Sequence, residues 1–260
     1  MDFLIAFGHP LYQRFSRLVW FGVFVTHLFR SIVRNCKRSF NVLIQGTSFQ
    51  IYFTCIQALP VVFFLALFVV AIFITQARSF AMNTDSAGLV ANLFVVIVIR
   101  ELAPLLTALV VVGRSGTAIA SELASMAANQ EINALKIMGV DPFYYIVVPR
   151  LLGIVVSMVC LSLTFSLLSM FFTMTIGFYM LDISPGSLLG QVTAFLTGMD
   201  LLLNLVKSAI FGLVISLVCT FCGFSAQGAT TEIPQVTTHA VIASVFWCFV
   251  ISALVTVLVY

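Results

Sequence analysis

Charged residues are scarce in this chain. Of its 260 residues, only 8% are Asp, Glu, Lys or Arg, whereas 62% are hydrophobic. A soluble domain carries about 25% charged residues, and its surface must face water. The composition therefore excludes a soluble enzyme, a nucleic-acid-binding protein and a disordered chain. It indicates a protein that crosses a membrane several times.

Several motifs of enzymes and metal proteins are missing as well. The three lysines follow Cys36, Leu135 and Val206, so the chain has no GxxxxGK loop for the phosphates of ATP. It has no HExxH motif and only three histidines, which disfavours a zinc site. Its six cysteines are scattered, as expected of small buried side chains. We therefore expect no cofactor or metal in this chain and no ATP hydrolysis by it.

Long apolar runs give the map of the membrane spans. Four runs contain no charged residue, namely 39–77, 151–181, 208–231 and 233–260. Each is long enough for a spanning helix, which needs about 20 residues. A fifth apolar stretch carries two charges at its middle. We predict an all-α membrane protein with five transmembrane helices, near residues 50–76, 89–113, 151–181, 203–224 and 238–259.

Basic residues outside the spans fall almost entirely on one side of the predicted membrane. Nine precede the first span or separate the second from the third: Arg14, Arg17, Arg30, Arg34, Lys37, Arg38, Arg114, Lys136 and Arg150. The connection at 77–88 has only Arg78, and the two later ones have none. Because cytoplasmic loops are enriched in Lys and Arg, we predict a cytoplasmic N-terminus and, after five spans, a C-terminus on the outer side.

Residues 11–38 suggest a helix in the cytoplasmic interface. Their apolar centre, Leu18–Phe29, has 12 residues and is too short to span. Arg30, Arg34 and Arg38 repeat along one helical stripe, which suits contact with headgroup phosphates. The alternative is a simple positively charged anchor before the first span.

The predicted second span carries adjacent charges, Arg100 and Glu101. A charge at the bilayer centre costs about 2.5–3.5 kcal/mol on insertion scales. Neighbouring residues lie about 100° apart on a helix, so each needs a partner elsewhere, either in a polar cavity or on another span. Pro104 removes the hydrogen-bond donor to the carbonyl of Arg100 and predicts a kink. Lys207 is a third charge within the spans, and it either lines the same cavity or extends to the outer interface.

The connection after the second span contains an amphipathic segment, 121–138. Its apolar residues recur at helical spacing, and Gly139 is a natural helix end. Such a helix on the cytoplasmic side either lies in the interface or docks a soluble partner.

One short motif favours an enzyme. Residues 113–116 read GRSG and fit the GxSG motif of rhomboid-type intramembrane serine proteases, with Ser115 as nucleophile and His239 as a possible base. The motif is four residues long with one wildcard, and the predicted five spans differ from the six of rhomboids. A rhomboid-like protease therefore stays an alternative.

The stretch 100–152 resembles the signature of the MlaE family, the permeases of ABC-type phospholipid transporters for outer-membrane lipid homeostasis. The matching pieces are RELAP at 100–104, GRSG at 113–116, INAL at 132–135, MGVDP at 138–142 and PR at 149–150. Glu122 and Met126 also fit the family pattern. A weaker match follows at 222–244, so the resemblance covers nearly the whole chain.

The resemblance implies a single permease domain over 1–260, which forms a homodimer with a lipid cavity. It implies a cytoplasmic ATPase that binds ATP and Mg²⁺ and contacts a coupling helix at 121–138, and a periplasmic MCE-domain carrier. Arg100, Glu101 and Lys207 would line the lipid cavity. The residues that would couple the permease to the ATPase are Glu122, Met126, Gln130, Glu131, Leu135, Lys136 and Asp141.

From these observations we expect the permease subunit of a phospholipid transporter in the bacterial inner membrane. A subunit that only serves as a scaffold is the other alternative, and it would tolerate polar substitutions at Glu101 and Lys207.

Overall fold

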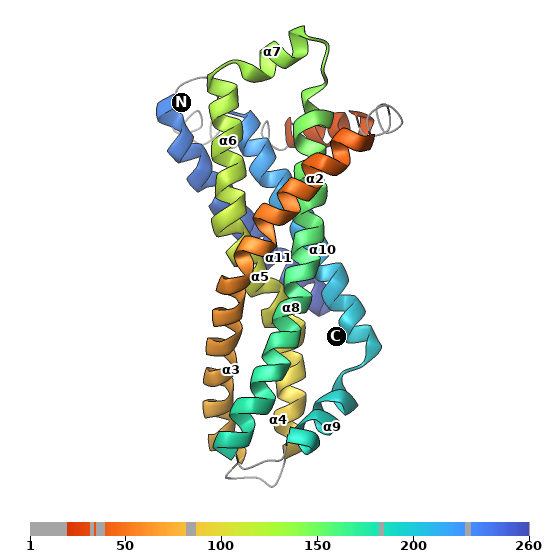
Figure 1. Ribbon diagram of the computed structural model, residues 1–260, viewed down its shortest axis with the longest axis vertical. Helices are drawn as coiled ribbons and strands as arrows, with labels where there is room; N and C mark the ends of the chain where they lie inside the picture. The colour runs from red at the N-terminus through yellow and green to blue at the C-terminus, as the bar shows by residue number, and fades with distance from the viewer. Residues whose placement is uncertain are drawn as a thin grey trace, which may run out of the picture.

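The computed structural model describes residues 20–31, 34, 40–81, 87–181, 185–226 and 230–259. Every regular element in these ranges is a helix (Figure 1). Five helices are long and apolar enough to cross a membrane: Leu43–Ala77, Ala91–Ala128, Phe143–Met180, Gly198–Phe224 and Ile233–Leu258. The predicted all-α membrane class and its five spans are confirmed.

The first span is broken into two helices. Helix α2 (Phe40–Thr54) ends at a short turn with the 3₁₀ segment η1 (Ile56–Ala58), after which α3 (Leu59–Ala81) runs in another direction (Figure 1). Pro60 explains the position of the break, because a proline ring clashes with the carbonyl four residues earlier but is tolerated in the first turn of a helix.

The second span is longer than predicted. It begins with α4 (Ala87–Leu93) and continues without a gap through four further segments. These are η2 (Phe94–Leu102), α5 (Ala103–Val111), η3 (Val112–Gly116) and α6 (Thr117–Ala128). Segments η2 and η3 are π-helical, a conformation that occurs mostly as short insertions in α-helices and often at functional sites.

The single helix predicted over 121–138 is wrong. Helix α6 ends at Ala128, and a separate short helix, α7 (Glu131–Ile137), lies across the end of the molecule (Figure 1). Gln130 separates them with a φ of 59°, in the left-handed region that a helix cannot continue through. The second span thus reaches as far as Ala128, and only α7 forms the connection.

Helix α8 (Val148–Leu181) is the central packing element and follows the π-helical turn η4 (Phe143–Val147). One of its faces is fully buried, and its members recur every three or four residues: Ile154, Met158, Leu161 and Phe165. Its main partner is α10 (Gly198–Phe224), which approaches closely at Gly212. A Cβ on Gly212 would lie 2.8 Å from the Cα of Val155, so glycine allows this contact.

Two elements complete the bundle. Helix α9 (Pro185–Phe195) lies in the predicted outer connection and packs against α4 and α8, at the end of the molecule opposite α7 (Figure 1). Helix α11 (Ile233–Val259), which follows the 3₁₀ turn η5 (Thr230–Glu232), returns along α10 and α6.

The helical residues 20–31 lie across the molecule at the end that carries α7 (Figure 1). Phe24 and Leu28 pack on Val147 and Leu151 and form a second, smaller core. Ser31 donates a hydrogen bond of 2.6 Å to Asp141. Apart from Arg34, which is helical and exposed, the rest of the predicted interfacial helix, including Arg14, Arg17, Lys37 and Arg38, lies outside the described residues.

Candidate functional site

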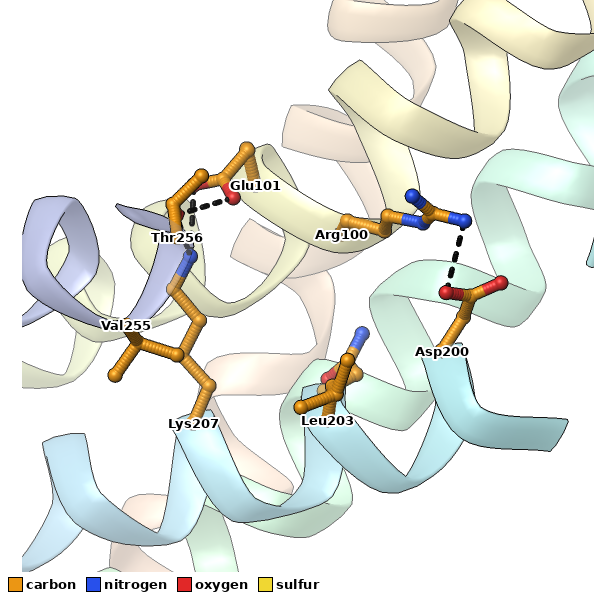
Figure 2. Close-up of a pocket in the computed structure, with 8 residues that line it drawn as sticks. Arg100, Glu101, Asp200, Leu203, Lys207, Val255 and Thr256 are labelled. Atoms are coloured by element: carbon orange, nitrogen blue, oxygen red, sulfur yellow. Dashed lines mark hydrogen bonds and ion pairs between the residues drawn. The ribbon is translucent and has the colours of Figure 1, made fainter. Parts of the chain in front are cut away.

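The charges within the spans form two ion pairs between η2 and α10 (Figure 2). Nη2 of Arg100 lies 2.9 Å from Oδ1 of Asp200, and Nζ of Lys207 lies 2.7 Å from Oε2 of Glu101. Arg100 and Glu101 point to opposite sides, so each meets its own partner (Figure 2). Adjacent positions on a helix point in different directions, so this separation is expected. All three predicted cavity residues, Arg100, Glu101 and Lys207, thus lie at one site.

Helix α10 supplies its side of the cluster as one stripe. Asp200, Asn204 and Lys207 are spaced i, i+4 and i+7, so they share a helix face over about 10 Å. Asp200 also caps α10, because its Oδ2 accepts a 2.9 Å hydrogen bond from the backbone N–H of Thr197. The start of α10 and the charge of Arg100 are therefore fixed by the same carboxylate.

Glu101 is bonded to two other helices. Its carboxylate accepts hydrogen bonds from Lys207, from Thr256 at 2.7 Å and from Ser252 at 3.2 Å, and the last two belong to α11. Its side chain is 34% exposed, whereas that of Lys207 is only 4% exposed. The pair thus buries its cation, whereas the side chain of its acid is partly exposed.

Asn204 connects the cluster to the central helix. Its Nδ2 donates to the carbonyl of Ile99 at 3.0 Å and to Ser166 at 3.2 Å, and its Oδ1 accepts from Ser162. Ser162 and Ser166 belong to α8. We call this set the charge cluster, and it consists of Arg100, Glu101, Ser162, Ser166, Asp200, Asn204, Lys207, Ser252 and Thr256.

The charge cluster is closed in this conformation. The space that its charged residues line has a volume of about 10 Å³, which is room for roughly one water molecule. A lipid does not fit between these side chains while the ion pairs are formed. A lipid could enter between these charged side chains only if the ion pairs separated.

Pro104 marks a change in backbone hydrogen bonding. The N–H of Ala103 donates to the carbonyl of Val98, five residues earlier, and α-helical bonding resumes from there. Pro104 is one of the first two residues of α5, where its missing N–H is tolerated. Arg100 and Glu101 lie in the π-helical segment directly before α5 and contact α10 and α11.

The predicted coupling residues separate into two groups. Several make contacts within the chain. Glu122 forms an ion pair with Arg150 at 2.7 Å, and Met126 and Leu135 pack on the core. Asp141 accepts hydrogen bonds from Ser31 and from the N–H of Phe143. Three others, Gln130, Glu131 and Lys136, are exposed on or beside α7. Ile137 and Met138 next to them are 87% and 68% exposed and form an apolar tip. Met138 belongs to the apolar pattern predicted over 121–138, whereas Ile137 had not been singled out.

The protease alternative finds no support at Ser115. This residue is 1% exposed, and its hydroxyl makes no hydrogen bond to any residue that the structure describes. A serine nucleophile needs a base within hydrogen-bond reach. Within the described part of the chain there is also no group of three or more His, Cys, Asp and Glu residues that could hold a metal ion.

Sequence reasoning missed Asp200, Asn204, Ser252 and Thr256. Asp200 was assigned to the connection before the fourth span, because that span was predicted to begin at residue 203, whereas α10 begins at Gly198. The i, i+4, i+7 spacing of Asp200, Asn204 and Lys207 was the available signal. Ser252 and Thr256 are also four residues apart, but nothing in the sequence distinguishes them from other small polar residues in spans.

An all-α bundle of five spans, with paired charges inside and an exposed short helix at one end, has the features of a membrane permease. Residues 47–258 match the family described as Permease MlaE, so the chain belongs to the MlaE permease family. The resemblance drawn from residues 100–152 is confirmed.

Proteins similar to this chain include probable ABC transporter permeases. A probable ABC transporter permease protein of Rickettsia prowazekii is 28% identical over 81% of this chain and 82% of its own length. A probable ABC transporter permease protein of Synechocystis is 32% identical over 58% of this chain and 57% of its own. The chloroplast protein of Arabidopsis thaliana named trigalactosyldiacylglycerol 1 is 27% identical over 68% of this chain and 50% of its own length. The chain is an ABC transporter permease, which implies an ATPase partner.

Proposed function

We propose that this permease moves phospholipid between the inner membrane and a periplasmic MCE-domain carrier, for lipid homeostasis of the outer membrane. The observation that carries the proposal is the charge cluster, because ionised side chains within membrane spans are costly and usually mark a substrate path. The name of the chloroplast relative contains that of a glycerolipid, which supports lipid as the class of cargo.

The partly exposed side chain of Glu101 supports a cavity between two copies of the chain. Helix α11 lies beside Glu101 and exposes a row of large apolar residues, among them Phe246, Leu254 and Leu258. A second copy covering this face would place two Glu101 side chains around one cavity, with α11 supplying its apolar wall. A homodimer is therefore part of the proposal.

The exposed tip formed by Ile137 and Met138 supports docking of the ATPase at α7. Apolar side chains rimmed by charges are typical of the centre of a protein interface, and Glu131 and Lys136 supply the rim. ATP and Mg²⁺ would be bound by that partner. This placement puts α7 and residues 20–31 on the cytoplasmic side, as the distribution of Lys and Arg predicts.

The test is ATP-dependent transfer of a fluorescent phospholipid from vesicles that contain the permease and its ATPase to the MCE-domain protein. The decisive variant combines Glu101→Gln with Lys207→Met, which removes both charges together and leaves no unpaired ion. We expect it to keep the fold and the ATPase but to lose transfer.

Ser115→Ala serves as the matched control, because Ser115 is buried and makes no hydrogen bond to a described residue. A permease should keep its transfer rate in this variant. Full transfer by the neutral double variant would remove the charge cluster from the mechanism, and loss of function in Ser115→Ala would favour a protease. Absence of an ATPase from the purified native complex would contradict the proposal as a whole.

A further inference from the structure

We propose that Arg114 holds the phosphate of a membrane phospholipid at the elbow between α2 and α3. This site is separate from the charge cluster and does not depend on what the permease transports. Arg114 lies in η3 of the second span, and its side chain reaches the break in the first span.

The charge of Arg114 is not neutralised within the described part of the chain. Arg100 and Lys207 pair with carboxylates in the charge cluster, and Arg150 pairs with Glu122 at 2.7 Å. Arg114 forms no ion pair with a described residue, although an arginine side chain is always charged. A guanidinium in an apolar span without an anion is costly, so an anion is expected beside it.

The guanidinium is nevertheless held in place. Nη2 donates to the amide oxygen of Gln57, and the guanidinium carbon lies 5.3 Å from the centre of the Phe53 ring, at cation–π distance. The other terminal nitrogen, Nη1, is buried and makes no hydrogen bond to a described residue. A buried donor left without an acceptor costs about 1–3 kcal/mol, and more when it is charged. The side chain is thus oriented, with one strong donor unused.

The surroundings of Arg114 fit a lipid headgroup with its acyl chains. Gly113 is exposed, and a Cβ placed on it would meet nothing within 4 Å, so the backbone beside Arg114 is open. Tyr52 and Ile56, on the same elbow as Phe53 and Gln57, are exposed apolar side chains. In a chain that spans a membrane, the molecule next to such a surface is a lipid. Phosphate is the anion that every phospholipid carries, and guanidinium binds it through paired donors.

The experiment measures lipid binding to the purified permease after removal of bound lipid, by native mass spectrometry. The probes are phosphatidylglycerol and diacylglycerol with the same acyl chains, which differ by the phosphate headgroup. We expect tighter binding of phosphatidylglycerol to the wild type and about a tenfold loss in Arg114→Gln, the size of one charge-assisted hydrogen bond. Diacylglycerol binding should be the same in both.

Arg150→Gln is the matched control, because it removes an arginine that already has a carboxylate partner. It should bind phosphatidylglycerol as the wild type does. If Arg114→Gln does not fold, Arg114→Lys keeps the charge and should still bind phosphatidylglycerol more tightly than diacylglycerol.

Three outcomes would overturn the proposal. The first is equal binding of phosphatidylglycerol to the wild type and to Arg114→Gln. The second is equal binding of phosphatidylglycerol and diacylglycerol to the wild type, which would mean that the phosphate contributes nothing to binding. The third is loss of a partner subunit in Arg114→Gln with lipid binding unchanged, which would assign Arg114 to a carboxylate of another protein.

Discussion

The charge cluster and helix α7 contain the same kinds of residue but use them differently. In the charge cluster each acid meets a base of the same chain, and hydroxyl and amide groups complete the contacts. On α7, Glu131 and Lys136 are exposed beside the apolar tip of Ile137 and Met138. The difference separates charges that position the helices of this chain from charges available to another protein.

The charge cluster and α7 differ because one lies inside the helix bundle and the other is exposed at its end. Inside the bundle an unpaired ion loses its hydration without compensation, so pairing is required for folding. At the exposed end of α7 water solvates each charge, and a contact within the chain adds little. Substitutions in the two regions should therefore change different quantities: stability in the charge cluster, and partner binding on α7.

The largest effect is expected when one member of a buried pair is removed. Glu101→Ala leaves Lys207, which is 4% exposed, without its carboxylate, and should reduce the free energy of unfolding by about 3–5 kcal/mol. The double variant Glu101→Gln with Lys207→Met should recover most of this loss. Thermal unfolding in detergent would measure both, and equal stability of the single and double variants would show that the pair is not coupled.

A somewhat smaller loss is expected where α10 packs against α8. Gly212→Ala places a methyl group 2.8 Å from the Cα of Val155 and should destabilise the protein by about 1–3 kcal/mol. Gly198→Ala on the same helix is the control, because nothing lies within 4 Å of its added Cβ. Chemical denaturation of both variants gives the comparison, and a stable Gly212→Ala would mean that α8 and α10 can move apart.

An intermediate effect is expected at the contact between residues 20–31 and Asp141. Ser31→Ala removes the 2.6 Å hydrogen bond and should cost about 1 kcal/mol, which increases local opening of this helical segment. Hydrogen exchange of residues 20–31 would report it. Thr26→Ala is the control, since Thr26 donates to the carbonyl of Val23 within the same segment. Unchanged exchange in Ser31→Ala would leave the packing of Phe24 and Leu28 on Val147 and Leu151 as the main attachment of this segment.

The smallest effect on stability is expected on α7. Charge reversal in Glu131→Lys or Lys136→Glu should change the free energy of unfolding by less than about 0.5 kcal/mol, because both side chains are exposed. The same variants should weaken binding of the ATPase, most clearly at low salt. A pull-down at graded salt tests this, with Asn133→Ala on the same helix as an uncharged control. Wild-type ATPase binding by both reversals would remove these charges from the interface.

Much of the fold was predictable because spans depend on composition. A run of about 20 apolar residues is sufficient to identify a spanning helix, and all five were found. The end of the second span was predicted less accurately, because the Ser, Glu and Asn residues after position 113 suggested a separate connection. The structure shows that a helix with such residues continues to Ala128 when one of its faces packs on α10 and α11.

The candidate site was predictable only in part. Arg100, Glu101 and Lys207 stood out because charges are rare in spans, and the need for separate partners followed from helix geometry. The identity of the partner residues could not be deduced from the sequence. Asp200 lies 100 residues from Arg100, and Thr256 lies 155 residues from Glu101. Contacts over such distances depend on how the helices pack, which a single sequence does not encode in any local pattern.

Composition and the periodicity of the apolar residues were thus enough to establish a five-span membrane protein, and the motifs of residues 100–152 were enough to indicate its family. Both are local properties of the chain, set by the transfer of side chains between water and lipid and by helix geometry. Which charges pair, how small their pocket is and that Arg114 meets no carboxylate of the described residues were decided by tertiary packing. The reason is that a buried ion is stabilised only by the groups that folding brings within a few ångströms of it.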